Sequence, residues 1–227
     1  MSTIITARDD AINIDPHISN VSLLLHGNGA NGSTTIVDSS PSPKAVTAVG
    51  NAQISTAQSR FGGASIAFDG TGDWLNTIAS VSPQSGDYTV EVFIRPTFTT
   101  GRDRVIYDCR STSDPQSNGF AFFINSIGYL QVYENAILRS ASTATVTANT
   151  WQHVALVSSG GTVTYYIGGT AAGSFAATTT ASLNTRIGAR QDGDAAFTGF
   201  IDEFRLTPGV ARYTANFTPP TAPFPDF

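Results

Sequence analysis

The 227-residue sequence contains little of what several classes of function require. Its single cysteine, Cys109, excludes an intrachain disulfide and reads as a small buried hydrophobic residue. Lys44 is the only lysine, and the basic residues are scattered, so no patch that could neutralise nucleic-acid phosphates is indicated. No segment approaches the ~20 apolar residues of a membrane-spanning helix. We therefore expect neither nucleic acid nor a membrane as a partner.

Common catalytic motifs are also missing. The sequence has no Gly-x-Ser-x-Gly, no His-Glu-x-x-His and no phosphate-binding Gly-Lys-Ser/Thr loop. Its three histidines are far apart in the chain. Asp202 and Glu203 are adjacent, and neighbouring residues of a regular strand point to opposite faces, so we expect that they cannot act as a pair.

What the sequence does have is a series of short apolar segments separated by glycine-rich turns. This pattern indicates an all-β sandwich or barrel, and the length fits one such domain. The expected strands are 21–26, 64–68, 73–77, 88–95, 104–109, 120–125, 129–134, 151–157, 163–168, 185–188 and 199–206.

The two ends differ from the middle. Residues 1–18 are polar and are expected to form an extended arm, with 19–227 as a single domain. Residues 1–15 lack the apolar core of a signal peptide. The proline-rich tail should lie along the domain, anchored by Phe217, Phe224 and Phe227. The arm could add a strand to a partner's sheet, and its predicted partner-binding residues are Ile4, Ile5, Ile12 and Ile14.

Several segments carry a family resemblance. In order, they are Val21–His26, Phe61–Ser65, Phe68–Leu75, Asp87–Pro96, Trp151–Val157, Arg186–Gly188 and Gly199–Arg205. Together they resemble a laminin-G-like domain, the concanavalin A-like jelly roll, over about 19–227. The resemblance implies a two-sheet antiparallel β-sandwich that serves more often as a binding scaffold than as an enzyme. Within it, His153 is expected to be a packed structural residue that bonds to the backbone.

Glucanases that share this fold carry three acids on one strand, in the pattern Glu-x-Asp-x-x-Glu. The corresponding strand here offers Glu91 alone, followed by Phe93 and Arg95. Retaining hydrolysis needs two carboxyl groups ~5 Å apart across the scissile bond. We therefore predict that the protein is not an enzyme.

Relatives of this kind often hold one calcium ion, which prefers 6–8 oxygen ligands. No cofactor is required, but calcium is the one metal candidate, with Asn28, Asp38 and Asp202 as ligands. The alternative is that Asp38 caps a turn and Asp202 bonds a neighbouring loop. The predicted ligand-binding residues are Asp69, Asp73, Trp74, Asp192 and Asp194, although the first two also suit a purely turn-shaping role.

A narrower resemblance lies in the flanks. Residues 15–26 and 209–220 are similar to the flanks of laminin-G-like domains in bacteriophage structural proteins. This resemblance implies a virion component assembled in the host cytoplasm, present in several copies among other virion proteins. We predict a capsid decoration (cement) protein with a lectin-like fold. The alternative is a tail adhesin or a free carbohydrate-binding protein that recognises host surface glycans.

Overall fold

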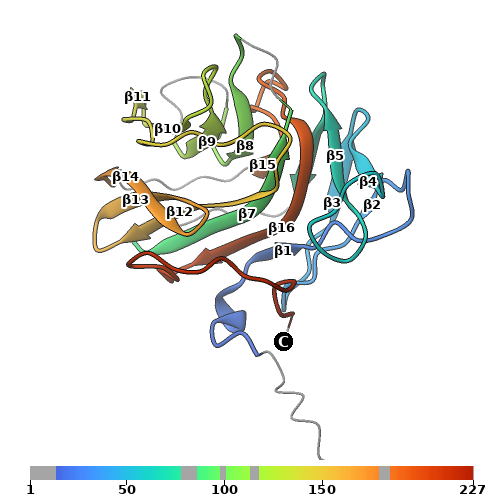
Figure 1. The fold of residues 1–227 in the computed structure, drawn as a ribbon, viewed down its shortest axis with the longest axis horizontal. Coiled ribbons are helices and arrows are strands. Elements are labelled where there is room, and N and C mark those ends of the chain that lie inside the picture. The colour runs from blue at the N-terminus through green and yellow to red at the C-terminus, as the bar shows by residue number, and fades with distance from the viewer. Residues whose placement is uncertain (1–13, 78–85, 98–100, 113–117, 179–184, 227) are drawn as a thin grey trace, which may run out of the picture.

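The computed structural model describes residues 14–77, 86–97, 101–112, 118–178 and 185–226. In Figure 1 the chain forms two antiparallel sheets that pack face to face, and each sheet has eight strands. The prediction of an all-β, two-sheet sandwich is confirmed. The one helical segment in these ranges is η1, a three-residue 3₁₀ turn at Ile18–Asn20, and none of them holds a helix that could cross a membrane.

We call the first sheet sheet A. Its order is β14-β13-β12-β7-β16-β5-β4, and β1 pairs with β16. The strands are β1 (Leu23–Leu25), β4 (Gln53–Ser55), β5 (Ser65–Asp69), β7 (Tyr88–Pro96), β12 (Gln152–Ser159), β13 (Thr162–Ile167), β14 (Thr170–Ala176) and β16 (Thr198–Pro208).

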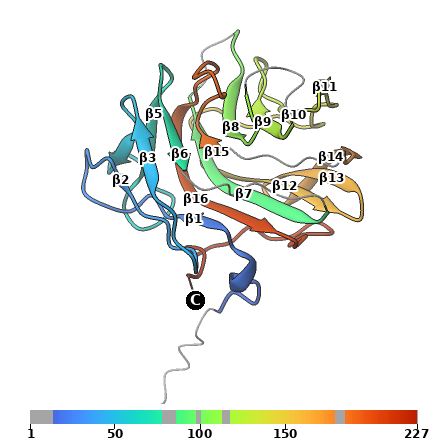
Figure 2. The same cartoon turned by 180° about the vertical axis from the view of Figure 1, so that it is seen from behind.

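The second sheet, sheet B, has the order β11-β10-β9-β8-β15-β6-β3-β2. Its strands are β2 (Thr35–Ile36), β3 (Val46–Val49), β6 (Trp74–Thr77), β8 (Arg104–Asp108), β9 (Phe120–Ile124), β10 (Leu130–Glu134), β11 (Ile137–Leu138) and β15 (Thr185–Ile187). Figure 2 shows this sheet from behind, with β8, β9 and β10 at the end of the molecule away from the C-terminus.

The core lies between the sheets because side chains alternate along each strand. On β9, Phe120, Phe122 and Ile124 point inward and join one large apolar cluster. Ala121 and Phe123 point to the outer face of sheet B instead. Thus β9 is apolar on both faces, although only one of them is packed against the other sheet.

Strand β16 departs from regular alternation. Its register with β7 shifts between Asp202 and Arg205, and Glu203 has a left-handed φ of 52°. The bulge turns both acids to the same side, where Asp202 accepts bonds from Arg60 and Phe61 and Glu203 accepts one from Phe224. The prediction that they face opposite sides was wrong, because a β-bulge breaks the period of two.

The predicted strands match observed strands, with small differences at their ends. Five strands were missed, namely β2, β3, β4, β11 and β14. The first four have only two to four residues. The fifth, β14, is built mainly from small and polar residues. Short strands and strands of small residues both lack a strong apolar pattern, so the sequence does not reveal them.

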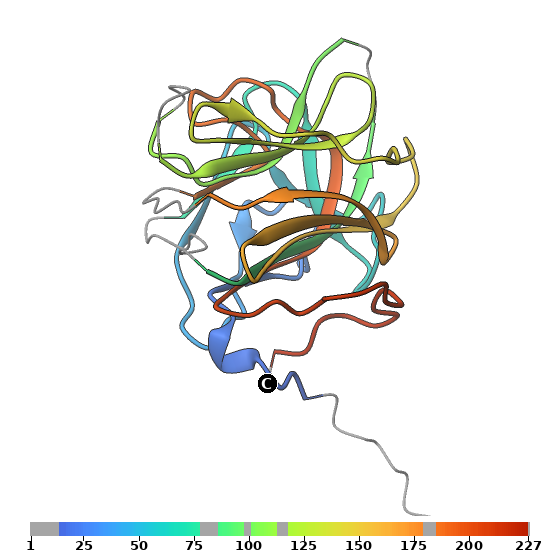
Figure 3. The ribbon, with the colours of Figure 1, turned by 90° about the vertical axis from the view of Figure 1, so that its left-hand side faces the viewer.

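The outer face of sheet A is covered. The C-terminal tail crosses it, as Figure 3 shows. Phe217 stacks on Tyr213 with ring centroids 3.5 Å apart, and Phe224 is buried against Phe93. These two anchors lie as predicted, and Phe227 lies outside the described residues.

The N-terminal segment reaches the same face. Asp15 is 3% exposed and forms ion pairs with Arg205 and Arg212 at 3.0 and 2.7 Å. The last residues of the predicted arm therefore pack on the domain. Among the predicted partner-binding residues, Ile14 is 61% exposed, whereas Ile4, Ile5 and Ile12 lie outside the described residues.

Candidate functional site

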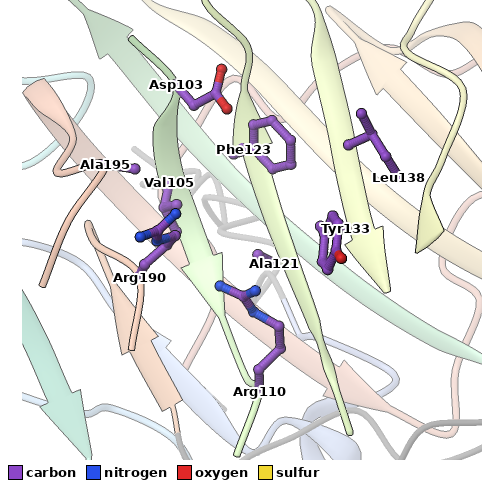
Figure 4. A pocket seen from close by; sticks show the side chains of 9 residues that line it. All are labelled: Asp103, Val105, Arg110, Ala121, Phe123, Tyr133, Leu138, Arg190 and Ala195. Atoms are coloured by element: carbon purple, nitrogen blue, oxygen red, sulfur yellow. The ribbon is translucent and has the colours of Figure 1, made fainter. Parts of the chain in front are cut away.

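A hollow of about 300 Å³ opens on the outer face of sheet B. Its floor is made by Val105 of β8 and by Ala121 and Phe123 of β9, whose alternate side chains form the core. Tyr133 of β10 and Leu138 of β11 form one wall, as seen in Figure 4. Leu138 is 56% exposed. The floor residues are themselves buried, so the apolar surface that the hollow offers to solvent comes mainly from Leu138 and the half-buried Tyr133. A hollow with an apolar floor and an aromatic wall fits a binding site.

Two arginines also line the hollow, and the Arg110 guanidinium lies 5.7 Å from the centroid of the Tyr133 ring. The Arg110 guanidinium is held by Asp108 through Nε–H and Nη2–H bonds of 3.0 and 2.6 Å. Arg190 is held in the same way by Asp192, at 3.1 and 2.6 Å. Figure 4 shows both guanidinium groups directed over the floor. Each carboxylate occupies the Nε and Nη2 edge of its arginine, so the Nη1 groups are placed to serve a ligand.

The ion pairs differ in burial. Asp108 is fully buried and also accepts a bond from the backbone N–H of Gln191, which fixes the position of Arg110. Arg190 and Asp192 are more than one-third exposed, and the hydrogen bond from Arg190 lowers the pKa of Asp192. Asp103, which is exposed, adds an acceptor at the rim. The pocket thus presents fixed donors and acceptors around an apolar floor.

Ala195 lies where the pocket meets neighbouring hollows. Its φ of 51° is unusual for a residue with a Cβ, and its carbonyl accepts a 2.9 Å bond from the N–H of Val105. Left-handed alanine is a strained choice that persists when surrounding contacts hold it. Its methyl group is small enough to leave the passage open.

The structure places the predicted ligand-binding residues in two groups. Asp192 and Asp194 lie beside the pocket, where both contact Arg190. Asp69 and Asp73 shape a turn instead: buried Asp73 accepts bonds from the N–H groups of Asn51 and Asp69. Trp74 is half-buried, with the Arg186 guanidinium 4.5 Å from its ring centroid.

The predicted calcium ligands do not act alike. The Asp38 carboxylate accepts bonds from the backbone N–H groups of Leu24, Ser40 and Lys44, so it caps a turn, the alternative given above. Asp202 Oδ1 is buried and has no hydrogen-bond partner in the described ranges. Asn28 lies against Gly62, next to the Phe61 N–H that Asp202 binds. Asp202 Oδ1 and Asn28 thus keep oxygen atoms near Phe61, whereas the Asp38 carboxylate is used by the turn.

The surroundings of Asp202 also affect its charge. Burial and the charge of Glu203 raise the pKa of Asp202 to about 7 despite three backbone hydrogen bonds that act the other way. A bound cation would relieve the repulsion between the two carboxylates. Within the described residues, however, no group of three His, Cys, Asp or Glu side chains gathers at one point. Backbone carbonyls would have to supply most ligands.

The single acid of the glucanase-like strand lies elsewhere. Glu91 is fully buried on the covered face and bonds to Arg205, to Tyr213 and to His153 Nε2. His153 is a packed residue as predicted, but its partner is this carboxylate rather than the backbone. Burial opposes ionisation of Glu91, yet Arg205 and His153 together lower its pKa to about 2.

Sequence reasoning missed Phe123, Tyr133, Arg110 and Arg190. A signal was available for the floor, because Phe-Ala-Phe-Phe-Ile is apolar at every position and leaves one apolar face outside the sandwich. No comparable signal links the two arginines, which lie 80 positions apart in the chain and meet only through the pairing of β8 with β15.

The sequence matches a protein-family model, Laminin_G_3, described as the concanavalin A-like lectin/glucanases superfamily, over residues 69–211. No curated protein matches the chain.

Solved structures share the fold at low sequence identity. Domain 4 of AbnA, a GH43 extracellular arabinanase from Geobacillus stearothermophilus solved in complex with arabinotriose, is 17% identical with a TM-score of 0.62. That match covers 84% of this chain and 93% of the domain. A mutant Trypanosoma rangeli sialidase displaying trans-sialidase activity is 14% identical with a TM-score of 0.55. It is matched over 83% of this chain but only 31% of its own length. Identities this low show the fold alone.

Proposed function

Because the chain belongs to the concanavalin A-like lectin/glucanase superfamily, in its Laminin_G_3 family, we propose that it is a non-enzymatic module that binds glycans on the outer face of sheet B. The observation that carries the proposal is the pocket of Figure 4, where an apolar floor and Tyr133 face two fixed arginines. A sugar ring offers an apolar face for packing and hydroxyl groups for hydrogen bonds, so it complements both parts of the pocket.

The proposed absence of catalysis is supported by the position of Glu91. Its carboxylate is fully buried beneath the tail and bonded to Arg205, so a glycosidic bond cannot reach it in this arrangement. In the pocket itself the acid that lines the wall is Asp103. A glycosidase would need a second carboxyl group across the bond from the first. Release of reducing sugar by the protein, lost in Glu91→Gln, would contradict this part of the proposal.

The binding proposal is tested on a glycan array followed by calorimetry with the glycans that bind. We expect Tyr133→Ala to weaken binding roughly tenfold, because it removes the aromatic wall. Tyr129→Ala is the matched control, since Tyr129 precedes β10 and does not line the pocket. Arabinotriose is the first probe, because the arabinanase domain with the same fold was solved with it. Equal losses in both variants would contradict the assignment of the pocket.

We also propose a setting for the module: a virion, where it decorates a capsid or tail among other virion proteins. Two observations support it. Residues 15–26 and 209–220, which carry the resemblance to phage proteins, are held together by the Asp15–Arg212 ion pair. The part of the first segment before β1 and the second segment lie on the covered face of sheet A, opposite the pocket, so a particle attached there would leave the pocket outward. Mass spectrometry of purified particles tests this, and absence of the protein from them would refute it.

Calcium at Asp202 and Asn28 is the proposed metal site, with the unpartnered Asp202 Oδ1 as its support. The ion would neutralise Asp202 beside Glu203 and thereby stabilise the covered face. A rise in melting temperature on addition of CaCl₂, absent in Asp202→Asn, is the expected result. An unchanged melting temperature would leave Asp202 as a turn-bonding residue.

A further inference from the structure

We infer that the pocket is one section of a longer groove, and that its ligand is a linear, uncharged oligosaccharide that occupies several sections at once. The inference rests on the proposed glycan binding and names the class of glycan. Two more hollows, of about 180 and 220 Å³, adjoin the pocket, and the smaller one extends to the loop after β5 and to Thr198 at the start of β16. A single sugar would fill only part of this space.

Shared lining residues place the three hollows next to one another. Asp103 and Ala195 line all three, and Arg190 lines the pocket and the hollow next to it. Arg102 and Asp194 then continue from that hollow into the third. The groove therefore runs from Leu138, past Ala195, to the tip of the loop after β5.

The two ends offer different contacts. At the β11 end the floor is apolar and the wall is aromatic. At the other end the lining includes Gly70, Thr71 and Gly72, all of which precede β6. Gly70 and Gly72 have φ values of 89° and 69°, which the turn can adopt because they lack a Cβ. This end presents backbone and hydroxyl groups, so it suits further hydroxyl-rich units of a chain rather than another stacked ring.

The charges favour an uncharged ligand. Positive and negative side chains are equal in number here. Six of them line the groove, namely Arg102, Arg104, Arg110, Arg190, Asp103 and Asp194, and two more, Asp108 and Asp192, form ion pairs with Arg110 and Arg190. Sugar hydroxyls both donate and accept hydrogen bonds, so they can use donors and acceptors placed side by side. An acidic glycan would meet Asp103 and Asp194 at like charge, which opposes its binding.

The test is calorimetry with arabino-, xylo- and cello-oligosaccharides from disaccharide to pentasaccharide, with oligogalacturonides as acidic probes. In the neutral series that binds, we expect the Kd to fall roughly fivefold or more between disaccharide and tetrasaccharide. The reason is that the added sugar units gain about one net hydrogen bond with the protein. The affinity should not change on addition of NaCl, since no net charge is paired.

The variant Arg102→Ala tests the section of the groove that includes the loop after β5. Its side chain is exposed, and its contact with Arg104 uses the backbone carbonyl, which the substitution keeps. We expect Arg102→Ala to remove much of the gain with chain length while disaccharide affinity stays unchanged. Arg95→Ala, on β7 of the other sheet, is the matched control and should change neither.

The outcomes separate the two proposals. Affinity that is independent of chain length but lost in Tyr133→Ala would overturn the groove and leave glycan binding in place. Tighter, salt-sensitive binding of oligogalacturonides would overturn the assignment of an uncharged ligand. Failure of every neutral and acidic probe to bind would overturn both the groove and the proposed function.

Discussion

The two outer faces of the sandwich begin from the same alternation of side chains and end in opposite states. On sheet A, the outward residues of β7 are Glu91 and Phe93, and both are buried by the tail and the N-terminal segment. On sheet B, the outward residues Ala121 and Phe123 of β9 are also buried, but they form the floor of a pocket whose wall residue Leu138 is 56% exposed. What separates the faces is whether the chain's own ends pass over them.

The difference also governs the charges. Beneath the tail, Glu91 meets Arg205, His153 and Tyr213, so its negative charge is compensated at every side. In the groove, arginines are fixed by carboxylates only along one edge. On the closed face the polar groups hydrogen-bond to one another. On the open face part of the hydrogen-bonding capacity of the polar groups stays available to a ligand.

The largest expected effect is on the closed face. Glu91→Gln should lower the free energy of unfolding by about 4 kcal/mol, because it removes the buried carboxylate that pairs with Arg205 and His153 and leaves Arg205 only its pair with Asp15. Chemical denaturation measures the change, and Asp103→Asn on the open face is the matched control with an expected change near zero. Similar losses of unfolding free energy in both variants would contradict the distinction between the closed face and the open face.

Acid should act on the same cluster. The pKa of Glu91 is about 2 in the folded protein, below the ordinary 4.5, so the folded state binds fewer protons than the unfolded state. This contribution, about 3 kcal/mol, is fully present above the ordinary pKa and is lost as the pH falls from about 4.5 toward 2. Denaturation across this range checks it. Glu91→Gln should lack this part of the pH dependence, and an unchanged profile would contradict the assignment.

A smaller effect is expected where the N-terminal segment joins the closed face. Asp15→Ala should cost about 2 kcal/mol of stability, because Arg205 and Arg212 lose a buried partner but keep Glu91 nearby. Thermal melting of the full-length variant measures it, beside Asp226→Ala as an exposed control. If Asp15→Ala melts like the parent, the segment does not contribute to closing the face.

The smallest effect should lie on the open face. Leu138→Ser should change stability by less than about 0.5 kcal/mol, because the side chain is 56% exposed and packs on little. The same variant should weaken glycan binding, since Leu138 belongs to the pocket wall. A stability loss well above this limit, measured by denaturation, would mean that the face is closed.

The sandwich and its main strands follow from the sequence, because alternation and glycine turns report on local structure. The sequence also predicted Phe217 and Phe224 as tail anchors, and two of its predicted ligand-binding residues, Asp192 and Asp194, contact Arg190 of the pocket. The pairing of Arg110 with Asp108 beside Arg190 was not accessible, because it depends on which strands become neighbours. The bulge at Glu203 was missed for a related reason: glutamate carries no local signal for a left-handed conformation.

The ion pairs of Asp15 also determine how the domain would carry mechanical load. A pull on the chain before residue 15 passes through Asp15 to Arg205 of β16, and from Arg205 to Glu91 of β7. These two strands are neighbours in the middle of sheet A, so tension enters at its centre rather than through the three residues of β1 alone. A module tethered by its N-terminal segment would thus resist drag on a bound glycan with its most extensively paired strands.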